Sequence, residues 1–189
     1  MPDELPPDVI RSPDEVARRA LALFSVVGLA LGAERELVLQ WLRENELWDA
    51  LSPIEAGFID SSPPSRKQVI NATWWSERLV ILLWALGEVE QLPAADKQYD
   101  TREFQEVLPP FADISVPAFV ARAALRPDAE LIEMADSMLG LHWAARNAEL
   151  TDRASRAPVD IEIIQERHHA INWVIGYDGA PWDDVTTDT

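Results

Sequence analysis

The chain has 189 residues, enough for one domain with a sizeable core, and its 33 acidic and 16 basic residues give a net charge of −17. This charge disfavours binding to nucleic acid or to a membrane of anionic lipid, and it suits a basic partner. The sequence contains no cysteine, which excludes disulfides, thiolate nucleophiles and zinc sites built from cysteine.

The first part of the chain predicts a loose arm followed by a helix. Residues 1–11 are rich in proline and acids and predict a flexible N-terminal arm, while residues 12–189 are expected to form a single helical domain. The segment Ser12-Pro13-Asp14-Glu15 has the composition of a capping box with proline at the first helical position, which predicts a helix ending near Leu31. An uncharged run at 20–33 follows two arginines, but the long acidic segment before it is unlike a secretory signal, and the run is too short to span a bilayer. We therefore expect a soluble, cytoplasmic protein.

Capping residues, prolines and a period of 3.6 residues locate the remaining helices. They predict helices over 34–44, 53–58, 67–86, 101–107, 116–125, 128–150 and 158–175. The second half of the helix over 67–86 is apolar on all sides and should be buried. The predicted class is all-α: a compact bundle of about five major helices with short helices, long loops and an ordered acidic C-terminal tail.

The last predicted helix carries charged groups on a side that should be buried. Its apolar residues cover an arc about 200° wide. Glu166 and Arg167 project within this arc, and His168 and His169 lie at its two borders. A charge does not enter a core unpaired, because desolvation costs several kcal/mol. The helix therefore predicts polar partners elsewhere in the chain.

Two other helices offer such partners. Glu77 shares a face with apolar residues of the helix over 67–86, while His142 and Arg146 lie on the apolar face of the helix over 128–150, with Asp136 at the edge of that face. The predicted buried polar network consists of Glu77, Asp136, His142, Arg146, Glu166, Arg167, His168 and His169. Such a network can simply fix helix register, or it can serve acid–base chemistry with His142 or His169 poised by a carboxylate.

A metal site is a further alternative. Glu166 and His169 have the Glu-x-x-His spacing that di-iron bundle proteins use twice, but it occurs once here, so a di-iron site is not predicted. A single divalent metal held by Glu77, His142 and Glu166 remains an alternative. The sequence has no nucleophile elbow, phosphate-binding glycine loop or dinucleotide fingerprint, and we expect no cofactor.

The C-terminal tail, residues 177–189, contains one large apolar residue, Trp182. It is expected to pin the tail to the helices, and the alternative is an anchor that faces a partner. If Trp182 pins the tail, Asp183, Asp184 and Asp188 accompany it and are expected to meet arginines such as Arg146 or Arg167; in the alternative, they face the partner together with Trp182.

Short motifs are spaced along most of the chain after residue 10. They are Arg18-Arg19-Ala20-Leu21 with Val26-Val27-Gly28, Trp48-Asp49-Ala50-Leu51-Ser52-Pro53, Trp84-Ala85-Leu86-Gly87, Leu141-His142-Trp143-Ala144, Glu166-Arg167-His168-His169-Ala170-Ile171-Asn172-Trp173 and Trp182-Asp183-Asp184-Val185-Thr186-Thr187-Asp188-Thr189. Together they resemble the bacterial domain-of-unknown-function family 4272. The resemblance implies a bacterial, largely helical protein without an established activity. One departure is Met138-Leu139-Gly140, where the family has a Tyr-Arg pair.

These features favour a binding function over catalysis. We expect an acidic protein-binding module of the immunity or accessory type that faces a basic protein partner, as a monomer or small homo-oligomer. The alternative is an enzyme or ligand-binding protein that uses a buried pocket formed by Glu77, His142, Glu166 and Arg167.

Overall fold

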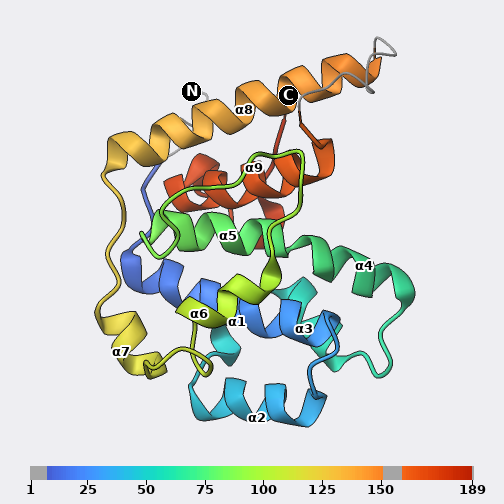
Figure 1. Cartoon of the computed structure of the whole chain (residues 1–189), viewed down its shortest axis with the longest axis vertical. Helices are drawn as coiled ribbons and strands as arrows, with labels where there is room; N and C mark the ends of the chain where they lie inside the picture. The colour runs from blue at the N-terminus through green and yellow to red at the C-terminus, as the bar shows by residue number, and fades with distance from the viewer. Residues whose placement is uncertain (1–7, 151–158, 189) are drawn as a thin grey trace, which may run out of the picture.

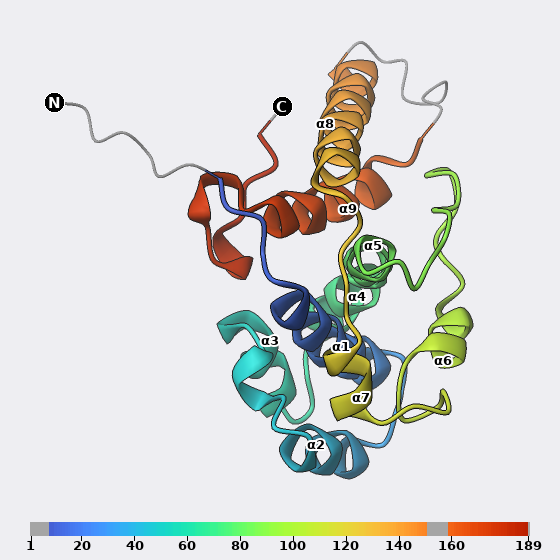
Figure 2. The ribbon, with the colours of Figure 1, turned by 90° about the vertical axis from the view of Figure 1, so that its left-hand side faces the viewer.

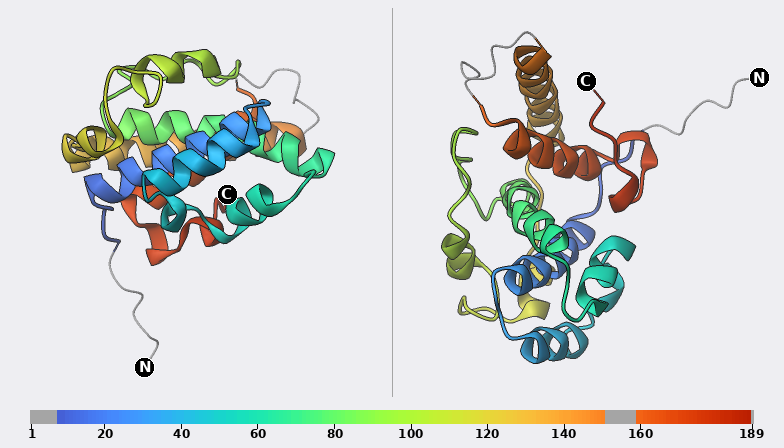
Figure 3. Two further views of the ribbon diagram at one scale, coloured as in Figure 1. Left: turned by 90° about the horizontal axis from the view of Figure 1, so that it is seen from below. Right: turned by 90° about the vertical axis from the view of Figure 1, so that its right-hand side faces the viewer.

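The computed structural model describes residues 8–150 and 159–188, and every regular element within these ranges is a helix. Figure 1 shows the main helices stacked in one order, with α8 (Asp128–Leu150) on α9 (Ile161–Ile175), α9 on α5 (Ser76–Ala85) and α5 on α1 (Pro13–Ala30). α2 (Arg35–Glu44) packs on α1, and it lies at the opposite end of the molecule from α8 (Figure 3). The predicted compact all-α fold is confirmed.

The shorter helices gather around α1. They are α3 (Pro53–Asp60), α4 (Arg66–Trp74), α6 (Phe104–Val107) and α7 (Val116–Ala121). α3, α4 and α7 pack directly on α1, and Phe104 of α6 meets Phe24 of α1 edge to face, with the ring centroids 6.4 Å apart. The uncharged run of α1 therefore lies in the core, and Leu21, Leu23 and Val26 are fully buried.

Serine side chains cap several helices, as expected from the sequence. The hydroxyl of Ser52 accepts from the Glu55 backbone N–H, and the Glu55 carboxylate accepts in return from the Ser52 N–H, which completes a capping box at α3. Ser12 caps α1 through the Glu15 N–H at 3.2 Å. The return half of that box does not form, because the Glu15 carboxylate pairs with Arg11 instead.

The helix predicted over 67–86 is divided into α4 and α5 at Trp75. Figure 1 shows α4 turning away from the line of α5. Two hydroxyls next to the break bind carbonyls three residues earlier: Ser76 donates to the Thr73 carbonyl at 2.8 Å, and Thr73 donates to the Ile70 carbonyl at 2.7 Å. Such bonds compete with the helical pattern and bend the backbone. The break lets α4 contact α1 and α9 while α5 remains inside the stack.

α9 begins at Ile161 with Asp160 as its cap, not at the predicted Pro158. Pro158 and the predicted loop at 151–157 lie outside the described residues, and residues 159–160 are not helical. The helix ends after Ile175, as predicted, at Gly176, which has the left-handed φ of 74°. A Cβ on Gly176 would come within 2.0 Å of the Val9 carbonyl oxygen. Glycine is required here by both the backbone angle and the close passage of Val9.

Part of the predicted N-terminal arm, residues 8–11, is held against the end of α9 (Figure 2). The Arg11 backbone N–H donates to the Val174 carbonyl at 2.9 Å, and its guanidinium donates to the carbonyls of Trp173 and Ala180. Residues 1–7 lie outside the described part of the chain. Residues 8–11 therefore hold the N-terminal end of the described chain against the C-terminal end of α9.

No helix in the described ranges is both long enough and apolar enough to cross a membrane. α5, whose second half is apolar on all sides, is enclosed by protein. All residues from Leu79 to Ala85 are buried, because α1 and α9 cover opposite sides of α5. This outcome confirms the burial predicted for the second half of the middle helix.

Candidate functional site

The most deeply buried charges in the described residues form an ion pair between α5 and α9. Nε of Arg167 donates to Oε2 of Glu77 at 2.9 Å, and both side chains are almost fully buried. The other Glu77 oxygen accepts from the Tyr99 backbone N–H at 2.7 Å, while Nη1 of Arg167 donates to the Pro93 carbonyl at 2.8 Å. The pair thus satisfies most of its own polar atoms and ties the connection after α5 to the core. These bonds make it a structural element.

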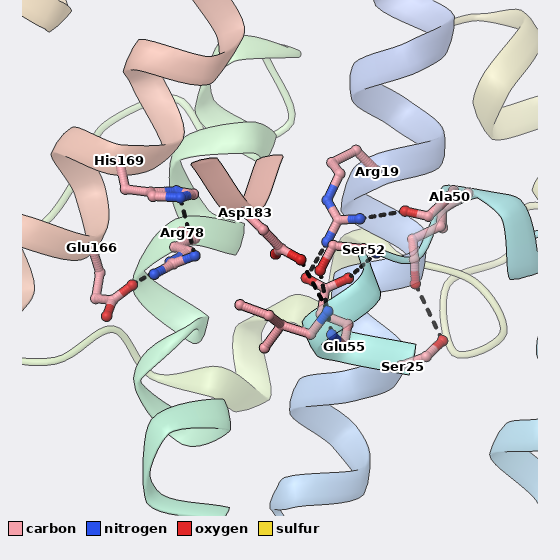
Figure 4. A network of polar contacts seen from close by, with 11 residues as sticks. Arg19, Ser25, Ala50, Ser52, Glu55, Arg78, Glu166, His169 and Asp183 are labelled. Atoms are coloured by element: carbon pink, nitrogen blue, oxygen red, sulfur yellow. Dashed lines mark hydrogen bonds and ion pairs between the residues drawn. The ribbon is translucent and has the colours of Figure 1, made fainter. Parts of the chain in front are cut away.

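A second group joins α5 to α9 near the tail. Nε of Arg78 donates to the Glu166 carboxylate, and Nη1 of Arg78 lies 3.3 Å from Nε2 of His169 (Figure 4). Burial, together with the Arg78 cation, lowers the pKa of His169 to about 2. His169 is therefore neutral near pH 7, and Nε2 serves as the acceptor for Arg78. Nδ1 of His169 lies near the Trp182 backbone but makes no hydrogen bond of acceptable geometry there or elsewhere in the described chain.

The remaining two histidines pair with each other between α8 and α9. The two Nδ1 atoms of His142 and His168 are 3.1 Å apart, and the rings meet edge to face. Burial lowers the pKa of both rings, and burial together with the neighbouring His142 lowers the pKa of His168 to about 4. With both rings neutral, one Nδ1–H donates to the other Nδ1. This pair fixes the largest helix–helix contact of the fold.

A further buried ion pair, which the sequence did not predict, joins α1 to α3. The capping box holds one Glu55 oxygen at the Ser52 N–H and directs the other to the Arg19 guanidinium, which also donates to the Ala50 carbonyl (Figure 4). Arg19 stacks on the Trp182 ring, with Cζ 4.4 Å from the centroid. The signal in the sequence was Glu55, since the capping box itself positions the acid three residues after the N-cap serine.

The tail lies across these groups. The Trp182 ring is buried and meets the rings of His169 and Trp173 edge to face, with centroids 4.9 and 5.1 Å away. The next residue, Asp183, accepts from the Ile54 N–H at the start of α3, where a carboxylate is favoured by the helix dipole. Of the two roles considered for Trp182, its contacts match that of pinning the tail.

Two hollows adjoin the tail. A pocket of about 230 Å³ is lined by Arg78, His169, Gln165 and Trp182 among others. A more open cleft of about 840 Å³ lies between α1, α3 and the tail, and it shares Trp182 with the pocket. Both hollows are lined by ionisable side chains: Arg78 and His169 line the pocket, and Arg19 lines the cleft.

The structure separates several residues that the sequence grouped together. Asp136 and Arg146 are exposed on α8 and lie outside the network, because the buried face of this helix runs through Ala135, His142 and Ala145. Asp184 and Asp188 are also exposed. In the described ranges no ion pair joins a tail aspartate to Arg146 or Arg167.

The alternative metal site is not assembled either. Glu77, His142 and Glu166 belong to three separate groups, each with its own partners. Within the described ranges no three histidine or acidic side chains are placed to hold a metal ion. The reason is geometric, because α9 directs Glu166, Arg167 and His168 to different neighbours around its circumference.

A different feature, an apolar groove, lies at the α2 end of the molecule and has a volume of about 890 Å³. α1 provides one side, α2 the second and the segment 101–111 the third. Three large apolar side chains in the groove are exposed: Leu31 at 54%, Leu37 at 61% and Phe111 at 61%. The Phe24 ring lies beneath them and meets Phe111 edge to face at 6.1 Å. The groove is therefore apolar surface that the fold leaves open to solvent.

The sequence contains a signal for this groove. Leu37, Val38, Trp41 and Leu42 form a wide apolar arc on α2. On a helical wheel Leu37 and Leu42 are about 140° apart, so a single short helix cannot turn both toward one neighbour. The structure buries Leu42 and exposes Leu37. An apolar arc this wide on a helix at the edge of a molecule indicates two apolar contacts, one internal and one external.

Comparison with curated proteins finds no match, and comparison with solved structures finds none either. A family model, in contrast, matches residues 2–185 of the chain. This range includes the buried ion pairs, the apolar groove and the tail as far as Val185. The resemblance noted in the sequence is thereby confirmed, and the chain belongs to the family described as Domain of unknown function (DUF4272).

Proposed function

We propose that this protein is a binding module that holds a protein partner in the apolar groove between α1, α2 and the segment 101–111, as an immunity or accessory protein would. The observation that carries the proposal is the exposure of Leu31, Leu37 and Phe111 within one hollow. Concave surface that combines exposed apolar side chains with a polar rim is typical of binding sites. The net charge of −17 favours a basic partner.

The buried ionisable groups fit this function in a supporting role. Glu77 with Arg167 and Arg19 with Glu55 are paired inside the protein and each binds backbone groups of a connecting segment. They hold the helices in register, so the groove at the other end of α1 has a fixed shape. A rigid surface loses less conformational entropy on binding than a mobile one.

Site-specific photocrosslinking in the native cell tests the proposal. A photoreactive phenylalanine analogue replaces Leu37 or Phe111, and the matched control carries it at Ile132, an exposed apolar residue of α8. We expect one protein to crosslink from both groove positions and not from Ile132. The purified partner should then lose at least about fivefold in affinity with Leu37→Ser, because a groove contact of this size contributes about 1 kcal/mol or more. Absence of a crosslink at both groove positions would contradict the proposal.

A further inference from the structure

The charged residues that α2 and its cap, Glu34, contribute to the apolar groove are acids. Glu34 and Glu44, at the two ends of the helix, line the apolar groove and are exposed. The two arginines of the helix are engaged elsewhere: Arg35 donates to the Ser61 carbonyl at 3.2 Å, and Arg43 lies over the Trp48 ring at 5.8 Å. α2 therefore presents acids but no arginine to the groove.

The opposite side of the groove adds no free positive charge. Arg102 is the cation among the described lining residues, and it pairs with Asp100 through Nε at 2.9 Å and through Nη2. The acids that line the groove are therefore those on the α2 side, Glu34 and Glu44. The groove is thus an apolar channel with an acidic rim.

The spacing of the rim acids defines the shape of an occupant. Glu34 and Glu44 are ten residues apart on one helix, which corresponds to about 15 Å along its axis. A partner helix lying along α2 would place two basic residues next to these carboxylates if they were about eleven positions apart, because eleven residues complete three turns. Apolar residues at intervals of three and four between them would face Leu37 and Phe111.

From this arrangement we infer that the groove receives an amphipathic helix of a partner protein, with an apolar face flanked by two basic residues about three turns apart. This inference rests on the proposed function and adds the conformation and charge of the partner segment. A second copy of the chain does not suit the groove, since two surfaces that each belong to a molecule of net charge −17 repel each other. The apolar face provides affinity, and the rim acids select the charge.

Designed peptides test the inference with the full-length protein. One peptide of about 18 residues has a leucine face and lysines about eleven positions apart, a second has glutamates at those two positions, and a third has the lysines with a scrambled apolar pattern. We expect the first peptide to bind in fluorescence anisotropy at least about fivefold more tightly than the second, more so at low salt, and the third not to bind. Changes in amide chemical shifts should lie on α2 and the segment 101–111.

Charge reversal in the protein provides the matched comparison. Glu34→Lys with Glu44→Lys should reverse the preference between the lysine and glutamate peptides. Glu133→Lys with Glu130→Lys, on α8, changes the net charge equally and should leave the preference intact.

Equal binding of the lysine and glutamate peptides would overturn the inference and leave the proposed function standing. Failure of every peptide, together with no crosslink at Leu37 or Phe111, would overturn both. A dimer that Leu37→Ser converts to a monomer would show that a second copy fills the groove, and would also overturn the inference.

Discussion

Each of two buried arginines in this protein is matched by a buried glutamate. Arg19 pairs with Glu55, and Arg167 pairs with Glu77. In both pairs the arginine also donates to a backbone carbonyl and the glutamate accepts from a backbone N–H. At the residue scale, each ion pair therefore fastens an irregular segment to a helix as well as joining two helices.

Loss of one member of such a pair should destabilise the fold strongly. Glu77→Gln leaves the Arg167 guanidinium buried without its counter-ion, and we expect the free energy of unfolding to fall by about 3–5 kcal/mol. Urea unfolding followed by circular dichroism measures this change. The double variant Glu77→Gln with Arg167→Met should lose less than the sum of the single losses.

The control for this prediction is an exposed pair. Arg122 lies 2.9 Å from Glu88 with half of its side chain in solvent. Arg122→Gln should therefore cost at most about 1 kcal/mol. A similar loss in Glu77→Gln and Arg122→Gln would contradict a structural role for the buried pair.

At the scale of elements, the fold depends on α9 because this helix contacts α5 on one side and α8 on the other. The His142–His168 pair sits in the second contact, with Arg146 close to His142 and His169 close to His168. Protonation of either ring of the pair would place a positive charge in a buried contact that lies close to the Arg146 guanidinium. The α8–α9 contact is therefore expected to respond to pH.

The sign of this response follows from the lowered pKa of His168, about 4 against an ordinary 6.5. Below pH 6.5 the unfolded chain binds a proton that the folded protein does not bind until about pH 4. The contribution to stability is thus complete above pH 6.5 and falls by about 1.4 kcal/mol per pH unit as pH decreases through this window. Urea unfolding at pH 7 and pH 5 should show a decrease smaller by about 2 kcal/mol in His168→Gln than in the unmodified protein. Equal decreases in the two proteins would exclude His168 as a cause.

The end of α9 offers a comparison between two glycines. Gly87 and Gly176 each follow a helix with a φ of 74°, but only Gly176 has neighbouring atoms, those of Val9, in the space a Cβ would take. Gly87→Ala should cost about 1 kcal/mol because of the left-handed backbone. Gly176→Ala should cost clearly more and should also release residues 8–11, which amide hydrogen exchange at Arg11 would report. Equal stability losses and unchanged exchange would show that the close passage is not important.

At the scale of the whole molecule, the dominant property is the acidic surface. The buried ion pairs Arg19–Glu55 and Arg167–Glu77 contribute no net charge. The excess acids that give the net charge of −17 therefore lie mainly at the surface. Mutual repulsion of like charges destabilises a compact state and is screened by salt. The same surface that favours a basic partner should therefore reduce the stability of the isolated protein.

Added salt should raise the melting temperature as a consequence. Between ~10 mM and ~0.5 M sodium chloride the screening length falls from about 30 Å to a few ångströms, and we expect a rise of a few degrees. Differential scanning calorimetry measures it. The variant that carries Glu130→Lys and Glu133→Lys has less repulsion and should show a smaller rise. A melting temperature that falls with salt would contradict this account.

The sequence by itself determined the helical class, the serine caps, the glycine at the end of α9 and the burial of α5. These features follow from local physics, because caps, φ angles and the period of apolar residues depend on residues only a few positions apart. Only the tertiary structure decided which polar groups meet. Glu77, Glu166 and His142 all lie on apolar helices, and they were expected to form one network. In the structure, successive residues of α9 face different neighbours, so these groups belong to separate pairs. The groove was decided in the same way, since whether Leu37 faces the core or solvent depends on where α1 and the segment 101–111 lie, and no local pattern specifies that placement.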